Sequence, residues 1–267
     1  MFNEEKILVA RQSGFQTILL TENQAGLRTL RFGEEGASQS VVNVGDPSHL
    51  ALPYARLLPA SLGFCTKLER MLIVGLGGGS LARFFRSHFR EMMIDVVELD
   101  PAVVDVARDH CGFEEDSQLR VHVDDGRDFI KSKTAPYDVI ILDTFDAESI
   151  PAHLTTLEFL NEVKNAVTPA GIVVANVWGP ASNPAYADML LTYRAAFDAV
   201  YIFDVPAPGT KLFAALKQTQ TISRDELIQK CHAISEKYGF KYDLSAEVAG
   251  FRDSRDETVR AGSVLTD

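Results

Sequence analysis

The first 60 residues alternate apolar and polar positions in short runs, a pattern typical of β-strands. Glycine-containing turns separate the runs ILVARQ, FQTILLTE and LRTLRF. From Pro47 to Leu62 the apolar residues recur at helical spacing, although Pro53 lies within the segment. We therefore predict a small β-rich N-terminal domain over residues 1–62 and a larger domain over residues 63–267.

From about residue 70 the pattern changes to long apolar runs that alternate with helical periodicity. An apolar run without polar interruption is typical of a strand that is buried on both faces, as parallel sheets require. Residues 71–75 form such a run. We predict four further strands at 93–100, 119–125, 137–143 and 171–177, of which the first two carry some polar residues. Amphipathic spacing predicts helices over 81–89, 101–109 and 157–167, a helix that ends at 197, and a helix over 223–238.

Two further apolar runs, residues 199–205 and 211–217, are joined by a short segment that contains two prolines and a glycine. This connection is too short for a crossover helix, so the last strand must run antiparallel to its neighbour. The sequence therefore predicts an α/β fold with a mostly parallel, seven-stranded sheet and an antiparallel last strand. That arrangement is typical of the Rossmann-like class I methyltransferase fold. We expect the charged segment after Ser245 to be loosely held.

Composition and charge narrow the classes of function. Of the 267 residues, 46% are hydrophobic and 24% are charged, as in a globular protein with a real core. The net charge of −11 argues against a nucleic-acid partner. It would attract a cationic small molecule, although an acidic surface more often serves solubility. The three cysteines are widely spaced and odd in number, which indicates neither a disulfide framework nor a zinc site, and no metal is expected.

The N-terminal sequence MFNEEKILVARQ carries acidic residues where a signal peptide needs a basic and then an apolar run. No apolar stretch approaches the roughly 20 residues that cross a bilayer. We expect a cytoplasmic protein without a membrane partner.

The first candidate binding element is a glycine-rich turn, with Gly75, Gly77, Gly78 and Gly79 directly after the first buried strand. Glycines at this place let the backbone approach a ligand closely and turn tightly into the next helix. Glu98 ends the next strand about 20 residues later, where a carboxylate can accept hydrogen bonds from ribose hydroxyls. Together they indicate an adenosine-type ligand, although NAD(P) and a merely solvated Glu98 remain alternatives.

Two further strand ends carry carboxylates. Asp125 and Gly126 follow the third strand, where the carboxylate can accept from an adenine amino group; nearby Asp128 is equally suited to cap a helix. Asp143 and Asp146 follow the fourth strand at the edge where open α/β sheets bind ligands. Two carboxylates there can hold a cationic nucleophile, and one can accept its proton.

Four segments of the sequence resemble a known family. The segments LIVGLGGGSLARFF, VVELDPAVVDVAR, RVHVDDGRDFI and YDVIILDTFDAESIPAHLTTLEF are similar to consecutive blocks of the spermidine synthase (polyamine aminopropyltransferase) family. The likeness covers most of residues 10–217, and the family also has a small N-terminal β-domain. The resemblance implies transfer of an aminopropyl group from decarboxylated S-adenosylmethionine to a small-molecule amine, within a homodimer or homotetramer.

The resemblance also implies roles for individual residues. Glu98 would bind ribose, and Asp125 with Gly126 would bind adenine. Asp143 would be the proton acceptor, with Asp146 beside it on the amine. Further candidates for substrate contacts are Gln39, which aligns loosely with a glutamine that contacts the cofactor, and Tyr54.

Three departures from the family pattern concern the substrates. Gly78 replaces an aspartate that grips the amino group of the aminopropyl chain. The Tyr-His-Glu segment of the amine pocket has only His49 and Tyr54 as approximate counterparts, and Ala147 replaces a proline. Without the carboxylate at position 78, we expect poor discrimination between decarboxylated and intact S-adenosylmethionine. An S-adenosylmethionine-dependent methyltransferase and a nucleotide-binding protein without transferase activity therefore remain alternatives.

Aromatic and histidine side chains give weaker indications. Trp178, after the fifth strand, would either wall the cleft or simply be buried. The remaining histidines are scattered through the sequence and are expected to be structural or solvated: His88, His110, His122, His153 and His232.

Overall fold

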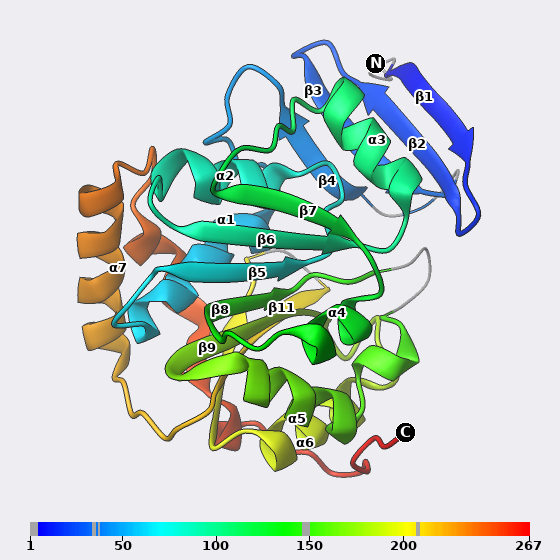
Figure 1. Cartoon of the computed structure of the whole chain (residues 1–267). Coiled ribbons are helices and arrows are strands. Elements are labelled where there is room, and N and C mark those ends of the chain that lie inside the picture. The colour runs from blue at the N-terminus through cyan, green and yellow to red at the C-terminus, as the bar shows by residue number, and fades with distance from the viewer. Residues whose placement is uncertain (1–4, 34–35, 37, 146–149, 207–208) are drawn as a thin grey trace.

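A computed structural model describes residues 5–33, 36, 38–145, 150–206 and 209–267. The N-terminal segment forms an antiparallel sheet in the order β1-β2-β3-β4. Its strands are β1 (Lys6–Gln12), β2 (Thr17–Glu22), β3 (Leu27–Phe32) and β4 (Ser38–Asn43). This sheet stands at one end of the molecule, above the carboxyl-edge side of the central sheet (Figure 1).

The central sheet has the strand order β12-β10-β11-β9-β8-β5-β6-β7. Its strands are β5 (Arg70–Val74), β6 (Met93–Glu98), β7 (Leu119–Val123), β8 (Tyr137–Leu142), β9 (Val167–Trp178), β10 (Ala199–Asp204), β11 (Thr210–Leu216) and β12 (Phe251–Asp253). Strands β5 to β9 pair in parallel, whereas β11 is antiparallel to both β9 and β10. The predicted Rossmann-like fold with its antiparallel strand is confirmed.

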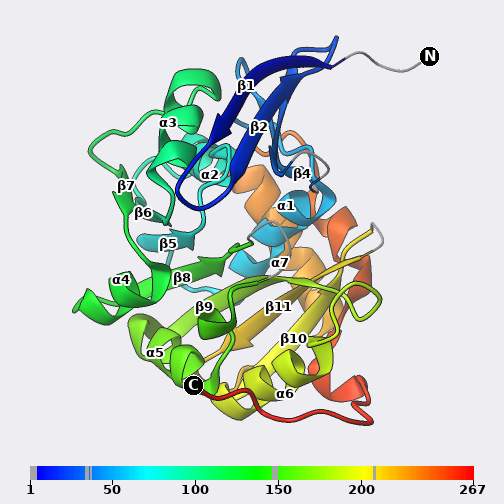
Figure 2. The same cartoon turned by 90° about the vertical axis from the view of Figure 1, so that its right-hand side faces the viewer.

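Helices cover both faces of this sheet (Figure 2). The α-helices are α1 (Pro53–Leu57), α2 (Ser80–His88), α3 (Pro101–His110), α4 (Gly126–Ser132), α5 (Leu157–Ala166), α6 (Tyr186–Ala196) and α7 (Arg224–Tyr238). Apolar side chains of α1, α2 and α7 share one core with the central strands, and those of α4, α5 and α6 fill the core on the opposite face.

Helix α3 joins the two sheets. Val103 and Val106 pack with Ile18 and Leu30 of the N-terminal sheet, while Val104 packs into the core of the central sheet. A helix with apolar residues on two sides therefore fixes the N-terminal sheet over the ends of β5 and β6.

The segment between the sheets differs from its predicted form. The helix starts at Pro53 rather than Pro47. A start at Pro47 would place Pro53 inside the helix, where its missing N–H and its ring disrupt the backbone hydrogen bonds, whereas the first turn does not need that N–H. A 3₁₀ helix, Leu58–Phe64, continues it, and Leu57 and Phe64 lie in the same core as Ile73 of β5. By packing, this segment belongs with the central sheet, so the division at residue 62 stays a prediction, and a boundary directly after β4 fits this packing better.

The C-terminal segment is also more ordered than predicted. A 3₁₀ helix, Leu244–Gly250, leads into β12, which pairs antiparallel with β10 and adds an eighth strand to the predicted seven. The last residue, Asp267, forms an ion pair with Arg127 of α4 at 2.6 Å. The expectation of a loosely held tail was therefore wrong. Within the described ranges, no helix is long and apolar enough to span a membrane.

Candidate active site

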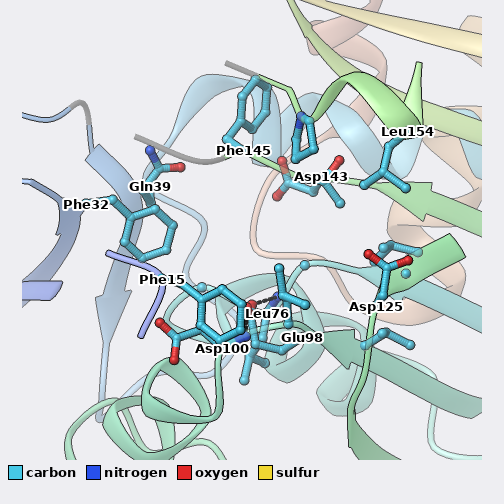
Figure 3. A pocket seen from close by; sticks show the side chains of 18 of the residues that line it. Phe15, Phe32, Gln39, Leu76, Glu98, Asp100, Asp125, Asp143, Phe145 and Leu154 are labelled. Atoms are coloured by element: carbon cyan, nitrogen blue, oxygen red, sulfur yellow. Dashed lines mark hydrogen bonds between the residues drawn. The ribbon is translucent and has the colours of Figure 1, made fainter. Parts of the chain in front are cut away.

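A cavity of about 310 Å³ lies at the carboxyl ends of β5, β6, β7 and β8 (Figure 3). Strand β4 and the β1–β2 turn close it from the N-terminal side. Phe15, Phe32 and Gln39 face the cavity from this side, opposite Asp125, Asp143 and Leu154. The two sheets therefore form one site between them.

The glycine-rich turn forms part of the wall. Gly75, Gly77 and Gly79 all have positive φ angles, of 103°, 53° and 76°, which glycine adopts without strain. A Cβ atom on Gly75 would lie 2.2 Å from the carbonyl oxygen of Asp143. Gly75 and Gly77 line the cavity, but Gly79 instead precedes the first residue of α2 and packs on Phe113.

Gly78 does not line the cavity either. Its φ lies outside the left-handed region, but a Cβ there would meet Val42 Cγ2 at 2.8 Å and Ser40 Cβ at 3.2 Å. Strand β4 therefore occupies the space that a longer side chain at position 78 would need. The obstacle to a carboxylate at this position is close packing rather than backbone strain.

Glu98 ends β6 and lines the cavity; its predicted contact with ribose stays a prediction. Its two carboxylate oxygens accept hydrogen bonds from the backbone N–H groups of Leu76 and Asp100, each at 3.0 Å. Burial raises the pKa of Glu98, and these backbone hydrogen bonds oppose the shift. Glu98 thus fixes the glycine-rich turn and keeps further lone pairs for a ligand.

Asp125 and Gly126 lie at the junction of β7 and α4. Asp125, rather than Asp128, is the N-cap of α4: its Oδ1 accepts from the N–H groups of Arg127 and Asp128 at 2.8 and 3.2 Å. A Cβ on Gly126 would lie 2.5 Å from Val74 Cγ1, so this position requires glycine for the close contact between β5 and α4.

Asp143 follows β8 and lines the cavity, where two side chains contact its carboxylate. Tyr54 Oη donates to Asp143 Oδ2 at 3.0 Å, and Asn176 Nδ2 donates to Oδ1 at 2.9 Å. Burial raises the pKa of Asp143, and the two hydrogen bonds partly offset this rise. Burial, together with the Asp143 carboxylate, raises the pKa of Tyr54 well above its usual value. A carboxylate with a raised pKa is a better proton acceptor for an amine near neutral pH.

The structure brings most of the predicted residues together. Gln39 lines the cavity. Tyr54 does not line it but donates a hydrogen bond to Asp143, which does. Asp146 lies outside the described residues, so its predicted role on the amine stays a prediction. Trp178 does not line the cavity itself but stacks on Phe145, which does, with ring centroids 5.2 Å apart.

Sequence reasoning missed several residues of this site. Phe15 lines the cavity with 57% of its surface exposed, and Leu99 with 45%. His153, expected to be structural or solvated, also lines the cavity. Asn176 reaches Asp143 from β9, where it is a buried polar residue within the run GIVVANV; that interruption is the one sequence feature that could have revealed it.

The cavity is strongly anionic. Five carboxylates line it: Glu98, Asp100, Asp124, Asp125 and Asp143. Among its described lining residues none is lysine or arginine. The described part of the chain also holds no group of three His, Cys, Asp or Glu residues placed to bind a metal ion. Five carboxylates without a lysine or arginine beside them favour a cationic ligand.

The fold and the cavity together define a nucleotide-binding protein of the Rossmann-like α/β class. Residues 54–219 match the family model "Spermine/spermidine synthase domain". The chain is 33% identical over 238 residues to a polyamine aminopropyltransferase of Vibrio vulnificus, which covers 87% of this chain and 79% of that protein. The chain therefore belongs to the spermine/spermidine synthase family, whose curated members are transferases. This confirms the predicted resemblance.

Methyltransferases are also similar to this chain. The human eEF1A lysine and N-terminal methyltransferase is 30% identical over 210 residues, which is 71% of this chain and 30% of that protein. The crystal structure of human methyltransferase-like protein 13 in complex with SAH aligns with a TM-score of 0.65 at 26% identity, over 71% of this chain and 93% of that one. A probable spermidine synthase from Corynebacterium glutamicum aligns with a TM-score of 0.80 at 20% identity, over 97% and 96% of the two chains, and this likeness concerns the fold alone.

Proposed function

We propose that this protein transfers the aminopropyl group of decarboxylated S-adenosylmethionine to a small-molecule amine. Family membership supports the reaction type, and the anionic cavity carries the argument for the ligand. The sulfonium, the ammonium of the aminopropyl chain and the acceptor amine are all cationic, and five carboxylates line the cavity that would hold them. Intact S-adenosylmethionine adds a carboxylate, for which the described lining offers no lysine or arginine.

Asp143 is the base in this proposal. It removes a proton from the acceptor ammonium, and the freed nitrogen lone pair attacks the carbon next to the sulfonium. A nitrogen–carbon bond forms as the carbon–sulfur bond breaks, and methylthioadenosine leaves with the electron pair on sulfur. Glu98 and Asp125 hold the ribose and adenine, so that the reacting carbon is aligned with the amine.

Asn176 positions this base. Its Nδ2 donates to Asp143, while its Oδ1 is buried and has no hydrogen-bond partner among the described residues. Tyr54 approaches the other oxygen of Asp143, so the carboxylate is held from two sides. A general base fixed in this way requires little rearrangement when the amine arrives.

The direct experiment measures methylthioadenosine release from decarboxylated S-adenosylmethionine with a set of linear diamines and polyamines as acceptors. Asp143→Asn is the matched control, because it keeps the shape of the side chain but cannot accept a proton. Release that depends on both the amine and Asp143 would support the proposal. Absence of release with every acceptor, from protein that binds the nucleotide, would contradict it.

Methyl transfer from S-adenosylmethionine is the second candidate. The similarity to a human methyltransferase over 71% of this chain and the glycine at position 78 favour it. Calorimetric titration with both nucleotides separates the candidates. We expect decarboxylated S-adenosylmethionine to bind more tightly, because the cavity supplies the negative charge missing at position 78. Equal affinities would agree with the poor discrimination expected from the sequence, and tighter binding of the intact nucleotide would favour methyl transfer.

Two further points of the proposal concern the protein in the cell. The family resemblance suggests a homodimer or homotetramer, which sedimentation equilibrium would test. We also propose a cytoplasmic location, which cell fractionation would test.

A further inference from the structure

His153 and Asp125 face each other across the end of the cavity that would receive the adenine ring. His153 Nε2 lies 2.9 Å from Asp125 Oδ2, and both residues line the cavity. A carboxylate oxygen accepts hydrogen bonds, so the ring nitrogen is the donor. The hydrogen bond also lowers the pKa of Asp125, against the opposing effect of burial, and so favours the ionised, accepting form.

The two oxygens of Asp125 have different partners. Oδ1 caps α4 through the backbone N–H groups of Arg127 and Asp128, whereas Oδ2 contacts His153. A carboxylate oxygen accepts about two hydrogen bonds. Oδ2 therefore keeps one position for a ligand, and the direction of that position depends on where His153 holds the carboxylate.

A hydrogen bond from Arg127 to the backbone fixes the position of His153. Its side chain is 47% exposed, so burial alone does not fix it. Its carbonyl oxygen accepts from Arg127 Nη1 at 3.3 Å. The Arg127 guanidinium is paired with Glu162 of α5 at 2.7 Å and with Asp267 at 2.6 Å. Asp267 thus supports, through Arg127, the short 3₁₀ helix Ala152–Leu154 that carries His153.

We propose that His153 is a positioning residue for nucleobase recognition, an inference that rests on the proposed adenosine-type ligand. By donating to Asp125 Oδ2, His153 fixes the carboxylate so that its free lone pair faces the 6-amino group of a purine. A 6-oxo purine presents an acceptor at this point and is disfavoured. His153, Asp125 and the Arg127–Asp267 pair then select amino purines over oxo purines.

The test compares the affinities of methylthioadenosine and methylthioinosine by calorimetry, in the wild type and in three variants. His153→Ala removes the donor, and His153→Gln keeps an N–H at a similar reach. His232→Ala is the matched control. His232 of α7 also contacts a carboxylate, with its Nδ1 3.1 Å from Asp243 Oδ2, but it does not line the cavity. Circular dichroism establishes that each variant is folded.

We expect the wild type to prefer methylthioadenosine and His153→Ala to reduce this preference about two- to tenfold, the range for one hydrogen bond. His153→Gln should restore most of it, and His232→Ala should leave it unchanged. Equal loss of affinity for both nucleosides in His153→Ala, or an unchanged preference, would overturn the inference and leave the proposed function intact. A wild type that fails to bind methylthioadenosine would overturn the proposed function as well.

Discussion

The Asp143 carboxylate accepts hydrogen bonds from two side chains and is largely shielded from solvent. Burial favours the protonated form and raises its pKa, and the donors Tyr54 and Asn176 recover only part of the difference. Ionised Asp143 therefore costs stability in the folded protein. The burial that suits Asp143 to its proposed role as a base therefore lowers the free energy of unfolding.

We predict that Asp143→Asn lowers turnover by about two to four orders of magnitude while nucleotide binding stays close to wild type. The same variant should unfold at an equal or higher temperature than wild type near neutral pH. The pKa of Asp143 is higher in the folded than in the unfolded protein. The cost of its ionisation to the stability of the wild type is therefore fully present above the folded pKa and shrinks as the pH falls through that value. It is absent below the unfolded pKa of about 3.9. Thermal unfolding between pH 4 and 8 measures this difference. A variant that is destabilised equally at every pH would contradict the argument.

Glu98 both holds the glycine-rich turn and faces the cavity. Its oxygens hold the N–H groups of Leu76 and Asp100 while the carboxylate lines the cavity. We predict that Glu98→Ala weakens methylthioadenosine binding tenfold to hundredfold, because charge-assisted hydrogen bonds worth about 1.5–3 kcal/mol are lost. Glu98→Gln, which keeps one acceptor, should lose less. Calorimetry on both variants checks this, and unchanged affinity in folded Glu98→Ala would show that the carboxylate does not contact the ribose.

Among the elements, the parallel strands and their following turns could be predicted because each carries a local pattern. The buried run of β8 and the glycine turn after β5 are examples, and they placed Glu98 and Asp143 at one edge of the sheet. Helix α4 was not predicted because it spans only seven residues. Its apolar residues are too few to show a helical period.

The contact between α4 and β5 leaves no room for a larger side chain at position 126. Gly126→Ala would place a methyl group 2.5 Å from Val74 Cγ1. We expect a loss of about 1–3 kcal/mol in the free energy of unfolding, the usual cost of overpacking a buried contact. Val74→Ala alone should also destabilise, but combining it with Gly126→Ala should restore part of the loss, because it removes the methyl group that clashes. Urea denaturation of the two single variants and the double variant measures the coupling; strict additivity would contradict the proposed clash.

The sequence could not predict contacts between residues that lie far apart along the chain. His153, Arg127 and Asp267 lie far apart in the sequence, and they meet only because α4, α5 and the C-terminal segment pack together. Strand β12 has three residues and joins the sheet through β10. No local periodicity marks either contact, so the C-terminal segment looked loose although it adds a strand to the sheet and supports one end of the cavity.

The charge of the whole molecule also acts on the cavity. The chain carries a net charge of −11, and the cavity collects five carboxylates between its two sheets. A surface of one sign with a cavity of the same sign raises the local concentration of a ligand of opposite charge. Added salt screens this attraction, because the Debye length falls from about 30 Å at 0.01 M to about 10 Å at 0.1 M ionic strength.

We therefore predict that the apparent KM for the acceptor amine rises several-fold between about 0.01 and 0.2 M sodium chloride, while kcat changes little. Methylthioadenosine is uncharged near neutral pH and is the matched control, since its dissociation constant should stay nearly constant over the same range. Initial rates and calorimetry in one buffer series measure both quantities. A KM that does not change with salt would mean that the amine is bound by short-range contacts alone. A parallel rise in the dissociation constant of methylthioadenosine would mean that salt alters the cavity itself, and either outcome would remove the role that we assign to the charge of the whole molecule.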